Sequence, residues 1–198
     1  MITVEKKHYK SWNSLKKQLE DLLCDALKER ISYFYTTYRK AHDHGGRASI
    51  NLDKKELLTC EWTVLEDQSY DIRDQYKKMP PHPSALEDYE ASKRAWIEAR
   101  EILTKEKWMP EGKLCEADFI ASASAYVNTD IAEALASENY LLRVFAYMDR
   151  RVGKRTLLKI GEEARKMPEW VRRFYEMRCD AEGLKFKENQ GESYVTKG

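Results

Sequence analysis

The chain has 198 residues, which is enough for one hydrophobic core or two small ones. Basic and acidic side chains nearly balance, 35 against 34, so the net charge favours neither a nucleic-acid nor a membrane-surface partner. Charged residues make up 35% of the chain, but five Trp, twelve Tyr and five Phe supply enough apolar area to exclude a disordered polypeptide.

Targeting and redox features predict a cytoplasmic protein without a membrane partner. The first residues lack the apolar region of a signal peptide. No run of residues approaches the roughly 18 apolar residues of a membrane span. The four cysteines, Cys24, Cys60, Cys115 and Cys179, are far apart in sequence, so we expect reduced thiols and no C-x-x-C metal or redox motif.

The N-terminal part of the chain predicts a helix followed by a small sheet. Residues 11–29 have the apolar spacing of an amphipathic helix. Three strand-like runs follow at 31–40, 47–52 and 56–62, and turn-like residues separate them. Short runs joined by tight turns predict a three-stranded antiparallel meander.

The remainder of the chain predicts helices. Three prolines within residues 80–83 form a break, and Ser84 and Glu87 have the spacing of a capping box that starts the next helix. Apolar periodicity and helix-start signals predict helices over 84–107, 116–127, 130–136, 139–152, 154–166 and 169–181.

These elements predict an α+β fold, in which an N-terminal helix and a three-stranded antiparallel meander pack with a larger, mostly α-helical C-terminal part. We expect a helix-plus-meander subdomain over 1–79, a helical subdomain over 84–182, and a disordered tail over 183–198. One core that runs through both subdomains is the alternative.

The candidate binding surface combines tyrosines with arginines, the residue types enriched at interface hot spots. Its members come from the first predicted strand and from the junction near residue 150, where Gly153 separates two predicted helices. They are Tyr33, Tyr35, Tyr38, Arg39, Arg150, Arg151, Lys154 and Arg155.

Two further functions remain alternatives. Residues 140–179 hold eleven Lys/Arg against five Asp/Glu, and a basic stretch of this kind can bind nucleic acid. His42 and His44, in the first turn of the meander, could assist an enzyme by holding a metal, although an ordinary polar turn is the favoured explanation. The P-loop, G-x-S-x-G and H-E-x-x-H motifs do not occur, so no catalytic, cofactor-binding or metal-binding residue is assigned.

Several short motifs resemble those of a family of uncharacterised bacterial proteins. They are Trp12-x-x-Leu15 with Leu23-Cys24, Tyr38-x-x-x-His42, Gly46-Arg-Ala48, Asp53-Lys-Lys-Glu-Leu57 and the run 149–157. The resemblance implies a bacterial cytosolic protein and supplies no catalytic residue. We therefore expect a protein without enzymatic activity or cofactor that binds another macromolecule, most simply a protein.

Overall fold

A computed structural model describes residues 11–37, 45–80, 84 and 86–184. It confirms the predicted α+β fold, with an N-terminal helix, a three-stranded antiparallel sheet and a mostly helical remainder. The elements in chain order are α1 (Trp12–Leu22), β1 (Ile31–Thr37), β2 (Gly46–Leu52), β3 (Lys55–Glu61), α2 (Val64–Lys78), α3 (Tyr89–Leu103), the π-helix η1 (Thr104–Trp108), α4 (Met109–Glu111), α5 (Glu116–Tyr126), α6 (Ile131–Ala136), α7 (Tyr140–Met148), α8 (Lys154–Arg165) and α9 (Glu169–Ala181). Most of the predicted tail, residues 185–198, lies outside the described residues.

The sheet has one buried face, as the two-residue period of its strands requires. Its strands follow in the order β1-β2-β3, and Tyr33, Ile50 and Leu58 lie opposite one another on the buried face. Asp53 and Lys54 join β2 to β3 with positive φ angles of 49° and 68°, the backbone of a two-residue hairpin turn. Arg30 stabilises this turn by an ion pair of 2.7 Å with Asp53.

Gly45, which precedes β2, and Gly46, its first residue, have no room for a larger side chain. A Cβ atom on Gly45 would lie 2.2 Å from Cδ1 of Trp62, and one on Gly46 would lie 2.7 Å from Cγ of Glu116. Both distances are shorter than van der Waals contact allows. Glycine therefore lets the end of β3 and the start of α5 approach this corner of the sheet.

Helix α1 ends seven residues before its predicted end at residue 29, because tertiary backbone hydrogen bonds replace the helical ones. The Arg150 amide donates to the Leu22 carbonyl, and the Cys24 amide donates to the Met148 carbonyl. Leu23 and Asp149 form an isolated antiparallel bridge between these bonds. The same bridge ends α7 at Met148, four residues before the predicted end of that helix at 152.

The region before α3 also differs from its prediction. Ser84 and Glu87 do hydrogen-bond at 2.8 Å, but they form a turn outside the helix, and Asp88 caps α3 by accepting from the Ala91 amide. Helix α2 lies in a stretch without a predicted element, and its buried residues are Gln68 and Ile72. The remaining predicted helices agree with the structure to within one residue at each end.

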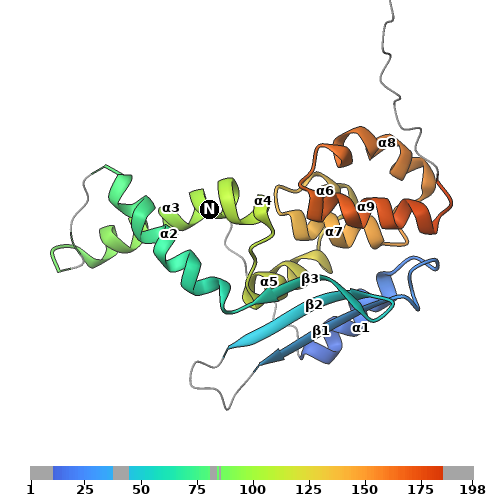
Figure 1. Ribbon diagram of the computed structural model, residues 1–198, viewed down its shortest axis with the longest axis horizontal. Coiled ribbons are helices and arrows are strands. Elements are labelled where there is room, and N and C mark those ends of the chain that lie inside the picture. The colour runs from blue at the N-terminus through green and yellow to red at the C-terminus, as the bar shows by residue number, and fades with distance from the viewer. Residues whose placement is uncertain (1–10, 38–44, 81–83, 85, 185–198) are drawn as a thin grey trace, which may run out of the picture.

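Figure 1 shows α5 between the sheet and the helices α6 to α9, whereas α2 and α3 lie side by side and project away from them. We call this projecting pair the α2–α3 arm. The main hydrophobic core contains buried side chains from α1, all three strands, α5 and the helices that follow it. A smaller core at the base of the arm contains Ile72, Ala99 and Trp108.

Candidate functional site

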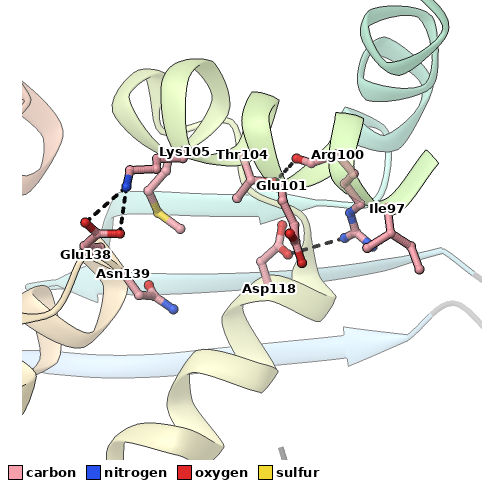
Figure 2. A pocket seen from close by; sticks show the side chains of 9 residues that line it. Ile97, Arg100, Glu101, Thr104, Lys105, Asp118, Glu138 and Asn139 are labelled. Carbon is pink, nitrogen blue, oxygen red and sulfur yellow. Dashed lines mark hydrogen bonds and ion pairs between the residues drawn. The ribbon is translucent and has the colours of Figure 1, made fainter. Parts of the chain in front are cut away.

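A cleft of 450 Å³ opens where the base of the α2–α3 arm meets the rest of the molecule. We call it the α3 cleft (Figure 2). The end of α3, the π-helix, α4, the first turn of α5 and the junction between α6 and α7 all contribute residues. They are Ile97, Arg100, Glu101, Thr104, Lys105, Met109, Asp118, Glu138 and Asn139.

The π-helix sets the positions of the residues that come from α3 and α4. Thr104 donates a hydrogen bond of 2.8 Å to the Arg100 carbonyl, one helical turn earlier. Trp108, at the other end of η1, is buried and donates from Nε1 to Asp71 of α2 at 2.8 Å, and Lys107 donates to the other oxygen of that carboxylate at 2.7 Å. Single π-turns within helices are frequent at functional sites.

Asp118 comes from the first turn of α5 and is held firmly. One of its oxygens accepts from the backbone amide of Cys115 at 3.0 Å and from the Cys115 thiol at 3.2 Å, which completes the helix cap. Its other oxygen lies 3.8 Å from the Arg100 guanidinium, which is beyond hydrogen-bonding distance. Burial, and then the Asp118 charge, raise the pKa of the Cys115 thiol to about 12, so this cysteine is no nucleophile at neutral pH.

The opposite wall of the cleft carries a second ion pair. Lys105 donates to both oxygens of Glu138, at 3.0 and 3.1 Å. The next residue, Asn139, caps α7 and donates to Ser122, so the backbone that carries Glu138 is fixed from two sides. Met109 supplies apolar surface, and its carbonyl accepts from Trp170 at 3.0 Å.

The charges of the cleft do not balance. Three carboxylates, those of Glu101, Asp118 and Glu138, line it together with only two cations. Within the described part of the chain, the Glu101 side chain has neither a hydrogen bond nor an ion pair (Figure 2). The arrangement suits binding, because it combines a net negative charge with the apolar surface of Ile97 and Met109.

The structure separates the two halves of the sequence-predicted surface. Tyr33 is only 3% exposed and packs against Phe145, so it offers nothing to a partner. Tyr35 packs against Trp12 at the first turn of α1, whereas Arg150 contacts Leu22 at the last. Ten residues of helix, about 15 Å, separate these two contacts. Tyr38 and Arg39 lie outside the described residues.

The basic half of that surface is partly engaged inside the molecule. Asp149 is buried and accepts from Tyr126 at 2.5 Å and from the Arg151 side chain at 2.8 Å. Arg178 is also buried and donates to the carbonyls of three residues, at distances of 2.8 to 3.1 Å: Tyr147, Asp149 and Val152. Arg150, Arg151, Lys154 and Arg155 are all exposed, and Lys154 donates to the Glu182 carbonyl at 2.8 Å.

These contacts weaken the nucleic-acid interpretation of residues 140–179. Arg143 lies 8% exposed, donates to the Ser137 carbonyl and pairs with Glu163. The buried Arg143 and Arg178 therefore serve the fold. Their charges are not free for phosphates, which need accessible Lys or Arg.

The described residues supply no support for a metal site or for a reactive cysteine. His42 and His44 lie outside the described residues, and the described ranges contain no group of three metal-ligating side chains. All four cysteines are buried, and burial raises the pKa of each thiol. In the part of the chain that the structure describes, no helix has the length and apolarity needed to cross a bilayer.

The comparison with protein families found a match over most of the chain. The matched family is the SF0329 protein family, over residues 11–179, and the chain belongs to it. The match covers every element from α1 to most of α9, including all residues of the α3 cleft. Comparisons with curated proteins and with solved structures found no match.

Proposed function

We propose that this protein works by binding another protein in the α3 cleft, without catalysing a reaction of its own. The main support for this proposal is the cleft itself. The exposed apolar side chain of Ile97 borders a cavity that is lined by charged side chains. Ile97 is 46% exposed. An exposed β-branched apolar residue at the rim of a concave site is a typical anchor for a partner.

The surface continues from the cleft along α3. Tyr89, Lys93 and Ile97 follow one another at intervals of four residues, and Arg100 and Thr104 continue the same helix face. Tyr89 is exposed, and the Lys93 ammonium lies 5.8 Å from the centre of its ring. A partner segment that lies along α3 would thus contact aromatic, aliphatic and charged groups in succession, the mixture expected of a protein interface.

The sequence-predicted surface remains an alternative proposal for the binding site, reduced to its exposed basic members Arg150, Arg151, Lys154 and Arg155. The exposed Leu158 lies close to them on α8, with 57% of its surface accessible. We also propose a bacterial cytoplasmic setting, which rests on the resemblance of the sequence motifs and on the four cysteines, which are buried as free thiols.

The test compares two matched substitutions in a tagged chain that is purified under native conditions from the source organism. Ile97→Gln removes the apolar rim of the cleft, and Leu158→Gln makes the same kind of change on α8. We expect quantitative mass spectrometry to show a stoichiometric partner whose recovery falls about tenfold with Ile97→Gln and stays unchanged with Leu158→Gln.

Other outcomes would reassign the function. Loss of the partner with Leu158→Gln alone would move the site to the basic α8 surface. Nucleic acid that co-purifies, raises the absorbance at 260 nm and leaves at high salt would favour the nucleic-acid alternative. Equal recovery from all three proteins would contradict the proposed cleft.

A further inference from the structure

We infer that the partner segment that enters the α3 cleft presents a lysine or arginine side chain to Glu101 and Asp118. This inference rests on the proposed function and adds the chemistry of the anchor residue. Its physical basis is the arrangement of charge and apolar surface within the cleft.

The cleft already contains two cations, Arg100 and Lys105. Lys105 is held by both oxygens of Glu138, so it does not neutralise the other carboxylates. Arg100 approaches Asp118 only to 3.8 Å. Glu101 has no partner among the described side chains, which leaves the Glu101 side of the cleft negative.

The geometry of the two carboxylates points the same way. Glu101 and Asp118 both line the cleft, with Arg100 to one side (Figure 2). Two like charges in one cavity repel, and a cation that enters the cavity lowers the energy of both. Asp118 cannot turn away easily, because its other oxygen is held by Cys115.

The apolar surface selects a long cationic side chain rather than a small ion. Ile97 and Met109 line the same cleft, so the methylene groups of a lysine or arginine can pack on them while the charged end reaches the carboxylates. The cavity, at 450 Å³, has room for such a side chain and part of its backbone. An acidic side chain would meet net repulsion here.

The test uses four small probes with the full-length protein: the N-acetyl amides of lysine, arginine, norleucine and glutamate. Titration followed by ¹⁵N NMR should show that the lysine and arginine amides shift backbone signals in 97–105 and 116–118. Norleucine amide, whose side chain is aliphatic like that of lysine but lacks the ammonium group, should bind about tenfold more weakly. Glu101→Gln should weaken the two basic probes by a similar factor, whereas Glu98→Gln, an exposed change on α3 outside the cleft, should not.

The results separate this inference from the proposed function. Ile97→Gln could release the partner while the basic probes bind no better than norleucine amide. That result would support partner binding in the α3 cleft and contradict the proposed lysine or arginine anchor. Preferential binding of glutamate amide would also overturn the anchor. Glu101→Gln is exposed and is expected to fold, and its unchanged circular dichroism would confirm that lost probe binding reflects lost charge.

Discussion

Asp149 joins three separate parts of the chain through its buried carboxylate. It accepts hydrogen bonds from Tyr126 of α5 and from both the amide and the side chain of Arg151, and its backbone pairs with Leu23 after α1. Such a group is costly to remove, because its partners lose their hydrogen bonds while they remain inside the protein.

We therefore predict that Asp149→Ala lowers the free energy of unfolding by about 2–4 kcal/mol, since it leaves the buried Tyr126 hydroxyl without an acceptor. Urea denaturation followed by circular dichroism measures this change. Asp180→Ala, an exposed aspartate on α9, is the control and should cost less than about 0.5 kcal/mol. A loss for Asp149→Ala as small as that of the control would refute the role of the buried carboxylate.

The residue type does not indicate burial when the same side chain is common both in cores and at surfaces. Tyrosine suits both an interface and a half-buried strand, and only the pairing of β1 with β2 decides that Tyr33 faces the core. The basic run 150–155 had the same ambiguity. Its charge was visible in the sequence, but the engagement of Arg151 by Asp149 depends on the turn that the chain makes after α7.

The base of the α2–α3 arm is held by polar contacts, among them the carboxylate of Asp71 and the Gln68 side chain, which donates to the Lys113 carbonyl at 3.2 Å. Asp71 of α2 accepts hydrogen bonds from Lys107 and from Trp108 of η1, and these bonds lower the pKa of its carboxyl group. A carboxyl group whose pKa is lower in the folded state stabilises the fold above its ordinary pKa of 3.8, and that stabilisation disappears as the pH falls through the folded-state value.

Asp71→Asn should accordingly loosen the arm at neutral pH and leave the main core intact. We expect faster hydrogen exchange in α2 and α3, measured by mass spectrometry at pH 7, with unchanged exchange in α7. The difference in thermal stability from the wild type should shrink below pH 3.8. Asp74→Asn, an exposed neighbour on α2, provides the control, and equal effects of the two changes would disprove the anchoring contact.

Most elements could be predicted because local signals mark their ends. Helices α6 and α7 begin at the side-chain caps Asp130 and Asn139, and α9 begins after Pro168. Helix α2 has a narrow buried face, with only Gln68 and Ile72 fully covered, so its pattern is weak. The early end of α1 depends on hydrogen bonds to residues more than a hundred positions away, which no local pattern contains.

At the scale of the whole molecule, the α3 cleft exists only because distant segments meet. Its residues come from 97–109, from Asp118 and from 138–139, and no motif links them in the sequence. A local hint in the sequence is Ile97, because an isoleucine outside the buried face of α3 has no role in the core. Residues 84–138, which supply most of the cleft, hold twelve Asp/Glu against six Lys/Arg, so this segment is acidic.

Position-specific photo-crosslinking in the source organism tests the proposed binding in the α3 cleft most directly. A photoreactive amino acid placed at position 97, and in a second protein at position 158, samples two exposed apolar sites on different helices. The proposed function predicts a discrete crosslinked protein from position 97, reduced by Tyr89→Ala on the same helix face, and none from position 158. A crosslink from position 158 alone, or from neither position, would contradict it.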